Sequence, residues 1–227
     1  MKTTLQSLVA ELTEGDAPDA ILRTSYADGT LKRLIPELDV LYGIPQSAQY
    51  HPEVDTGIHI ELVVAAAWEI TRSPRARFAA LVHDFGKGAT PQNEWPKHIN
   101  HEERGVPLVE TFCERLGAPD DWKTLGLLTS RWHLHAHRAL ESRPKTVLEM
   151  FEACNFLPDD ALLRDFVFAC EADKRGRGGD VALAPYPQGP FLLAAAAAAR
   201  DVVAPAEFLQ GNRIKAIADV AKVFADR

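Results

Sequence analysis

The chain has 227 residues, of which 46% are apolar and 25% are charged, so it can bury a sizeable core, and disorder is excluded as its main state. Its formal net charge of −7 argues against an extended basic surface that grips duplex nucleic acid through many phosphates. Neither the N-terminus nor the alanine-rich stretch 192–199 is long and apolar enough for a signal peptide or a membrane span. We therefore expect one compact cytoplasmic unit with no membrane partner.

The first 41 residues show their own helical pattern. Helical stretches at 5–12 and 20–35 are broken near Gly15 and Gly29. We expect residues 1–41 to form an N-terminal helical arm packed on the core.

The remainder of the chain is also dominated by helical periodicity, and no run alternates like a half-buried strand. Apolar residues recur at helical spacing within 62–67, 108–116, 125–133, 146–154, 162–172 and 214–225. The segment 183–190 is rich in proline and is the clearest predicted loop. The sequence thus predicts an all-α fold, with a core at 42–190 and C-terminal helices of the same unit at 191–227.

Three cysteines, Cys113, Cys154 and Cys170, lie among apolar neighbours and form no Cys-x-x-Cys pair. Buried free thiols are the favoured interpretation, and we assign them no chemistry.

The residues of chemical interest begin with His83-Asp84, which closes an apolar helical run and is followed by Gly86, Lys87 and Gly88. The dipeptide alone is a weak signal, because it arises often by chance. Near a helix end, however, an imidazole and a carboxylate can point into one site. The two glycines would let a substrate approach the backbone, and Lys87 would supply a positive charge for a phosphate oxygen.

Two or three histidines with two aspartates and no thiolate suit a borderline-to-hard divalent ion. Nickel, manganese, cobalt, iron and magnesium all remain candidates. An ion with open coordination positions can activate water and polarise a phosphoryl oxygen. The pattern therefore favours metal-dependent hydrolysis of phosphoesters.

Five strings make the interpretation more specific. They are HPEVDTGIH at 51–59, VHDFGKG at 82–88, WPKH at 95–98, EADKRGR at 171–177 and YPQG at 186–189. In this order they resemble the HD-superfamily domain of bacterial CCA-adding tRNA nucleotidyltransferases, from about residue 31 to about residue 189. That resemblance implies an HD-domain helical bundle. The Gly-Ser pair and Asp-x-Asp motif of the family's nucleotidyltransferase head do not occur in this sequence, so CTP and ATP addition to tRNA is not expected.

The resemblance also implies roles for individual residues. It assigns metal ligation to four side chains, namely His59, His83, Asp84 and Asp173. It implies that His101 and His133 complete a second metal site or bind phosphate, so that they join Asp84 and Lys87 as catalytic candidates. It places Lys87, Arg175 and Arg177 against the substrate phosphate. Trp95 lies in a motif-bearing loop and is a candidate to stack on a base by analogy with single-strand binders, although a core or rim position is the commoner role of such an aromatic residue.

The implied activities are those of a 2′,3′-cyclic phosphodiesterase, a 2′-nucleotidase and a phosphatase acting on nucleotide or RNA 3′-end phosphoesters. A nucleoside monophosphatase is an alternative. So is a non-catalytic module that binds tRNA, or dimerises, as the partner of a separately encoded nucleotidyltransferase. The sequence leaves a homodimer open.

Other histidines and cations have simpler interpretations. His51, before a proline in a loop, is expected to cap or position rather than ligate. The pairs His98/His101 and His133/His137 have spacings that imitate a zinc motif, but no His-Glu-x-x-His occurs, which excludes a metalloprotease. The cations at 174–177 would ordinarily be a solvated loop, but their position beside Asp173 favours phosphate binding.

Overall fold

The computed structural model describes residues 3–225, and every regular element in that range is a helix. A single antiparallel bridge joins Pro45 and Asp55. The elements in chain order are α1 (Leu5–Glu14), α2 (Pro18–Ala27), α3 (Thr30–Leu34), α4 (Pro36–Asp39), α5 (Thr56–Ile70), α6 (Pro74–Val82), η1 (Phe85–Ala89), η2 (Gln92–Glu94), α7 (His101–Leu116), α8 (Asp120–His137), α9 (Pro144–Ala153), α10 (Asp160–Arg175), α11 (Gly179–Leu183), α12 (Gln188–Arg200) and α13 (Ala206–Ala225). The all-α prediction is confirmed.

Three helices of the core, α5, α6 and α10, are preceded by a residue whose side chain caps the exposed backbone N–H groups. Asp55 accepts a hydrogen bond from the Ile58 amide at the start of α5. Ser73 does the same for α6, and Asp159 accepts from two amides at the start of α10. Such caps typically contribute about 1 kcal/mol each. They also fix the first turns of the helices on which the chemistry-bearing residues lie.

The apolar core consists of two clusters that share α5 and α6. One cluster contains residues of α1 to α4 with the buried faces of α5, α6 and α7. The other contains residues of α8, α9, α10, α12 and α13 with the opposite faces of α5 and α6. Within α5, for example, Val64 belongs to the first cluster and Val63 to the second. Helices α5 and α6 are therefore held from two sides.

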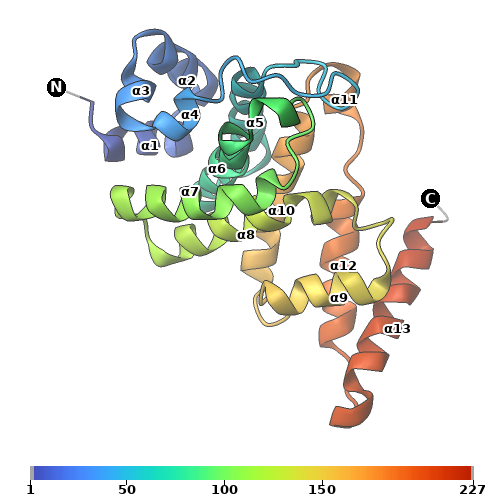
Figure 1. Ribbon diagram of the computed structural model, residues 1–227. Coiled ribbons are helices and arrows are strands. Elements are labelled where there is room, and N and C mark those ends of the chain that lie inside the picture. The colour runs from blue at the N-terminus through green and yellow to red at the C-terminus, as the bar shows by residue number, and fades with distance from the viewer. Residues whose placement is uncertain (1–2, 226–227) are drawn as a thin grey trace.

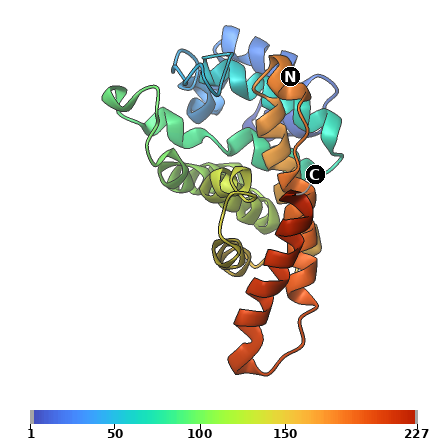
Figure 2. The same ribbon diagram turned by 90° about the vertical axis from the view of Figure 1, so that its right-hand side faces the viewer.

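Figure 1 shows α1 to α4 at one end of the molecule and the α12–α13 pair at the other. The view in Figure 2 shows that α12 and α13 run alongside one another and project away from the remaining helices. Helix α13 packs on α12 and α9, and only Ile217 of α13 is buried. No helix among residues 3–225 combines the length and the apolar character needed to cross a membrane.

One detail of the predicted secondary structure is wrong. The segment 183–190 was expected to be a loop, but Leu183 ends α11 and Gln188 already begins α12. Gly189 and Pro190 fit in the first turn of α12, where proline has no backbone N–H to leave unpaired. The three cysteines are free and buried, as expected.

Candidate metal centre

Five helices bring the predicted histidines and aspartates to one place. His59 lies in the first turn of α5, His83 caps the C-terminus of α6, and Asp84 follows it directly. Asp173 lies in the last turn of α10. Two further histidines come from α7, which begins at His101, and from the C-terminal part of α8, which carries His133. All six side chains are buried.

The first group of potential ligands consists of His59, His83 and Asp173, whose donor atoms lie within 4.8 Å of one another. The Nε2 atom of His59 is 3.2 Å from an oxygen of Asp173. The Nε2 atom of His83 is 3.2 Å from Oδ2 of Asp84 and 3.8 Å from Oδ1 of Asp173. The four predicted metal ligands are thus neighbours in the structure.

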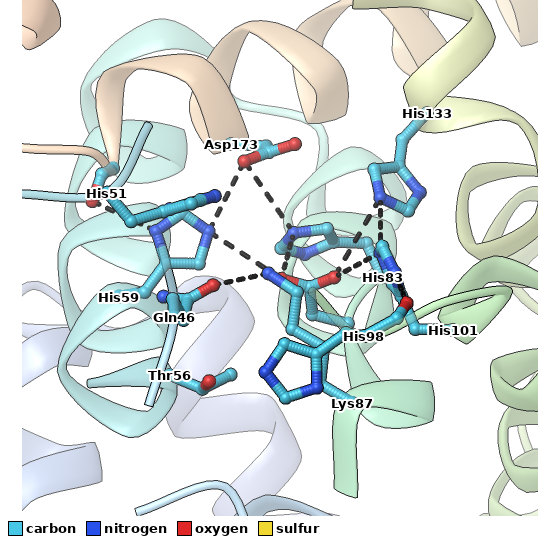
Figure 3. Close-up of polar contacts among 12 residues, drawn as sticks. Gln46, His51, Thr56, His59, His83, Lys87, His98, His101, His133 and Asp173 are labelled. Carbon is cyan, nitrogen blue, oxygen red and sulfur yellow. Dashed lines mark hydrogen bonds and ion pairs between the residues drawn. The ribbon is translucent and has the colours of Figure 1, made fainter. Parts of the chain in front are cut away.

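The second group consists of Asp84, His101 and His133, also within 4.8 Å of one another. Oδ1 of Asp84 is 3.3 Å from Nε2 of His101 and 3.8 Å from Nε2 of His133. Its other oxygen faces His83 of the first group. Figure 3 shows His59 on one side of the centre and His101 with His133 on the other. The Asp84 carboxylate lies between the two groups, one oxygen toward each.

The four histidines are oriented in the same way by the backbone. Nδ1 of each ring contacts a main-chain carbonyl, at 3.1 Å for His59, 2.7 Å for His83, 2.9 Å for His101 and 3.0 Å for His133. A carbonyl only accepts, so Nδ1 must be the protonated nitrogen in each ring. Nε2 is left to bind a cation, which is the arrangement that outer partners impose on metal-ligating histidines.

Several of these inward-facing atoms have no hydrogen-bond partner. Nε2 of His59, Nε2 of His83 and Oδ1 of Asp84 are all buried and unsatisfied. Leaving buried polar atoms unpaired costs free energy, unless a ligand or an ion satisfies them. The donor set of imidazole and carboxylate, without thiolate, suits a divalent transition ion or magnesium. The residues present therefore fit a divalent metal ion.

Charges within the centre keep its carboxylates ionised. Burial alone would raise the pKa of Asp84, but the neighbouring charges of His83 and Lys87 hold that pKa well below its usual range. Burial would also raise the pKa of Asp173, but the neighbouring charges of His137 and His83 outweigh burial and lower that pKa.

The histidines of the centre are affected in different ways. Burial and the proximity of His83 hold the pKa of His133 well below its usual value, which keeps this ring neutral. For His59, burial lowers the pKa, but the nearby carboxylates of Asp173 and Glu53 raise it overall to about 9. A metal ion bound at its Nε2 would therefore displace a proton.

A cavity of about 880 Å³ opens onto the centre. Asp84, Asp173, His101 and His133 line its inner part, together with Lys87. The Lys87 ammonium is buried, lies 2.6 Å from Oδ2 of Asp84 and donates a hydrogen bond to the side chain of Gln46. The predicted lysine is thus inside the site, adjacent to the predicted ligands.

Three side chains of the centre were not among the predicted site residues. His137 of α8 contacts Oδ2 of Asp173 through Nε2 at 2.5 Å. Glu53 lies 3.0 Å from Nδ1 of His59 and 2.8 Å from Nδ1 of His51. His137 had a signal in its spacing of four from His133, and Glu53 had one in its place within the string at 51–59. Gln46 had none, because its loop reaches the site only through the fold.

Of the three other residues predicted to contact the substrate, one lines the cavity and two do not. Arg177 lines the cavity. Arg175 is not among the lining residues, and its guanidinium pairs with Glu171 at 2.6 Å on the surface of α10. The Trp95 indole is also absent from the lining and donates to the carbonyl of Thr90, although Pro96 and Lys97 beside it do line the cavity. The roles of Arg175 and Trp95 stay predictions.

In each histidine pair whose spacing imitates a zinc motif, the two members contact different groups. His98 lies before α7, and its two ring nitrogens contact Thr90 and the carbonyl of Pro45. It therefore has no free nitrogen for a cation shared with His101. His133 faces Asp84 and His101, whereas His137 on the next turn of α8 faces Asp173.

The expected role of Gly86 is wrong. A Cβ atom on Gly86 would lie 1.8 Å from the carbonyl oxygen of His101 and 2.6 Å from the amide nitrogen of Gly105. The glycine thus permits close packing of η1 against α7, rather than the approach of a substrate. Gly88 similarly faces the side chain of Val40.

Comparison with known proteins agrees with this geometry. The HD domain family matches residues 56–163, a span that contains five of the six residues of the two groups and ends before Asp173. The chain is 44% identical over 201 residues to a multifunctional CCA protein of Xanthomonas campestris, covering 87% of this chain and 49% of that protein. It is 48% identical over 185 residues to the multifunctional CCA protein of Halorhodospira halophila, with 82% and 44% covered.

A third relative, the multifunctional CCA protein of Nitrosococcus oceani, is 44% identical over 203 residues, or 84% of this chain and 50% of that protein. The chain spans about half the length of the curated relatives it matches. Together with the helical bundle and its buried His/Asp centre, these matches show that the chain contains an HD domain and is similar over most of its length to part of the multifunctional CCA proteins.

Proposed function

We propose that this protein is a metal-dependent phosphohydrolase that acts on nucleotide or RNA-end phosphoesters, of the 2′,3′-cyclic phosphodiesterase, 2′-nucleotidase or phosphatase type. The observation that carries the proposal is the common orientation of four buried histidines. In each, a backbone carbonyl holds Nδ1 and directs Nε2 toward the carboxylates of Asp84 and Asp173. Such a costly arrangement of buried polar groups is understandable if it binds a cation.

In this proposal His59, His83, Asp84 and Asp173 hold the divalent ion. His101 and His133 either hold a second ion, with Asp84 between the two positions, or bind the phosphate. When bound, the ion supplies Lewis-acid chemistry, which activates water at neutral pH and polarises a phosphoryl oxygen. Nickel, manganese, cobalt, iron and magnesium are all compatible with the donor set.

Lys87 is proposed to act on the phosphoryl group itself. Its ammonium is buried beside Asp84 and lines the cavity, so a phosphate that enters the centre would meet a fixed positive charge. Preorganised charge of this kind stabilises the negative charge that develops on a reacting phosphoryl group, because it needs no reorganisation during the reaction. Gln46 holds the ammonium through a hydrogen bond to its side-chain oxygen.

The test is hydrolysis by protein that has been stripped of metal and reloaded with each candidate ion in turn. The substrates are 2′,3′-cyclic AMP, 2′-AMP, 3′-AMP and 5′-AMP. The variant Asp84→Ala is expected to lose metal-dependent turnover by at least about 10³-fold, since it removes a group facing both potential metal positions. Asp219→Ala is the matched control, because Asp219 is an exposed carboxylate of α13 that pairs with Lys222.

The pattern of turnover ranks the proposed activities. Preference for the cyclic or 2′-substrates supports the RNA-end proposal, and preference for 5′-AMP supports the nucleoside monophosphatase. If no ion gives turnover and the Asp84→Ala protein behaves like the wild type, the catalytic proposal fails. A non-catalytic module that binds tRNA, or a separate nucleotidyltransferase, then becomes the better explanation.

A further inference from the structure

The outer part of the cavity carries positive charges that have no ion pair or hydrogen bond to the predicted metal ligands. Lys97, Arg138 and Arg177 all line the cavity, in addition to the buried Lys87. Lys97 comes from the loop between η2 and α7, whereas Arg138 and Arg177 follow the C-terminal ends of α8 and α10. The cations at the opening of the cavity therefore come from three separate segments of the chain.

These three cations have no acidic partner among residues 3–225. Arg175 and Arg115, by contrast, pair with Glu171 and Glu37. The Nε atom of Arg177 is buried and has no hydrogen-bond partner. A buried guanidinium nitrogen without a partner is costly, and an anion in the cavity would satisfy it.

Arg138 and Arg177 are also tied closely to the centre through the backbone. Arg138 follows His137, whose ring contacts Asp173. Arg177 follows Gly176, whose carbonyl oxygen accepts from Nδ1 of His59. A Cβ atom on Gly176 would lie 2.3 Å from the Val63 side chain. This turn therefore packs closely on α5, and the packing fixes the backbone position of Arg177. Arg138 and Arg177 are thus each the next residue in the chain after one that contacts a predicted metal ligand.

The outer part of the cavity also contains an aromatic ring and a carboxylate. Tyr50 lines the cavity with 58% of its surface exposed, and it stacks on no aromatic ring within the described part of the chain. Exposed rings beside a cationic groove are suited to stacking against a base. Glu141 is the one acidic residue of the lining outside the metal centre, so three cations outnumber it.

From this arrangement we propose that Arg138 and Arg177 form a second phosphate subsite, which binds the backbone phosphate next to the reacting end, so that the preferred substrate is a strand end rather than a free nucleotide. Tyr50 then stacks on the base of the adjoining nucleotide. Guanidinium groups bind phosphate through paired hydrogen bonds, which ammonium groups cannot reproduce. The inference deepens the proposed function and rests on it, because it names the substrate class of the same cavity.

The kinetic test compares two substrates that differ by one upstream nucleotide. These are 2′,3′-cyclic AMP and the dinucleotide ApA with a terminal 2′,3′-cyclic phosphate. The wild type is expected to prefer the dinucleotide in kcat/KM by about tenfold or more, the size of one charged hydrogen-bonding contact. Arg138→Ala is expected to reduce this ratio to near one, and Arg138→Lys to restore it in part. The control Lys145→Ala removes an exposed cation of α9 that lies outside the cavity.

A binding measurement makes the inference independent of turnover. Fluorescently labelled adenosine oligonucleotides of one, two and four residues with a 3′-phosphate are titrated into metal-free protein in EDTA, and anisotropy is recorded at several salt concentrations. Affinity is expected to rise from one residue to two, and Arg138→Ala is expected to remove that rise. The salt dependence of the wild type should be steeper for two residues than for one, because each phosphate contact releases counterions.

The two proposals fail in different ways. Length-dependent binding that Arg138→Ala abolishes, without hydrolysis by any metal-loaded protein, supports the subsite and contradicts the hydrolase. Equal turnover of both substrates, with affinity independent of length, contradicts the subsite and leaves the hydrolase in place. Failure of both hydrolysis and binding contradicts both.

Discussion

The side chains at the inner end of the cavity are almost completely buried, whereas most cations of its outer part are exposed. His59, Asp84 and Asp173 are 0%, 1% and 4% exposed. Lys97 and Arg138 are exposed, and Arg177 is intermediate. Inside, a backbone carbonyl sets the orientation of four imidazoles, and α5 and α6 are packed between two apolar clusters. Outside, the three cations have no acidic partner among residues 3–225.

This difference separates two requirements of a hydrolytic site. A metal ion demands ligands held within about 0.5 Å, and sites built on rigid, well-packed helices provide that precision better than sites on loops. Recognition of a flexible phosphate chain requires charge more than fixed geometry. We therefore expect substitutions of the inner part and its supporting helices to change stability and metal binding, and substitutions outside to change substrate preference.

The largest effect on stability is expected for Phe78→Ala, because Phe78 is fully buried on α6 and packs against Phe112 and Trp122. Loss of a buried phenyl ring leaves a cavity and typically costs about 3–5 kcal/mol in the free energy of unfolding. Urea unfolding followed by circular dichroism measures this cost. The control Phe208→Ala removes an exposed ring of α13 and should change stability by less than about 0.5 kcal/mol. Equal losses would show that α6 is not held as tightly as its packing indicates.

Next in size is Gly86→Ala, in which the new methyl group would overlap the backbone of α7. Overpacking costs about 1–3 kcal/mol, and this substitution should lie near the upper limit because backbone atoms cannot rotate away. Gly211→Ala is a matched control of opposite sign. Gly211 lies in α13 with open space around it, so alanine should stabilise that helix by about 0.5–1 kcal/mol. Thermal unfolding of both variants decides whether Gly86 serves packing.

A divalent ion should stabilise the wild type and leave Asp84→Asn almost unchanged. At a concentration 100 times the dissociation constant, binding to the folded state alone contributes about 2.7 kcal/mol. The expected result is a rise in Tm with added nickel or manganese that EDTA reverses. Asp219→Asn, an exposed carboxylate on α13, should respond like the wild type. An Asp84→Asn protein that is stabilised equally by the ion would contradict the assignment of Asp84 to the metal.

The sequence predicted the helical class and most helix positions, because amphipathic spacing is a local property that each segment carries by itself. The strings around His59, His83 and Asp173 indicated residues that the fold then brings together, although His59 and Asp173 are 114 positions apart in the chain. Spacing alone could not show that α5 and α10 meet, nor that the carbonyl of Gly176 fixes the His59 ring. These facts depend on the tertiary packing of distant segments.

Some residues were missed or wrongly assigned from the sequence for the same reason, namely that their roles depend on tertiary packing. Gln46 enters the centre from a loop without periodicity, so no pattern marks it, and Glu53 lies within the string at 51–59 but nothing in that string shows which way it faces. Gly86 looked like a backbone opening for substrate because a glycine beside a predicted ligand often has that role, whereas the actual constraint is the backbone of α7. Local signals identify chemistry, but the direction in which a residue faces is decided by its neighbours in space.

The smallest effect is expected for Arg175→Ala, which tests where the outer part of the cavity ends. Arg175 is paired with Glu171 on an exposed helix face, and such a pair contributes only about 0.3–0.5 kcal/mol. Stability should therefore hardly change, and kcat/KM for the cyclic dinucleotide should stay within about twofold of the wild type, because this guanidinium does not line the cavity. Arg177→Ala, two residues further along and inside the cavity, should reduce that kcat/KM by about tenfold. The comparison is made with the same substrate, metal and salt concentration for both variants. If Arg175→Ala proved as damaging as Arg177→Ala, the phosphate chain would extend over the surface of α10, and the two arginines would have to act together as the sequence first indicated.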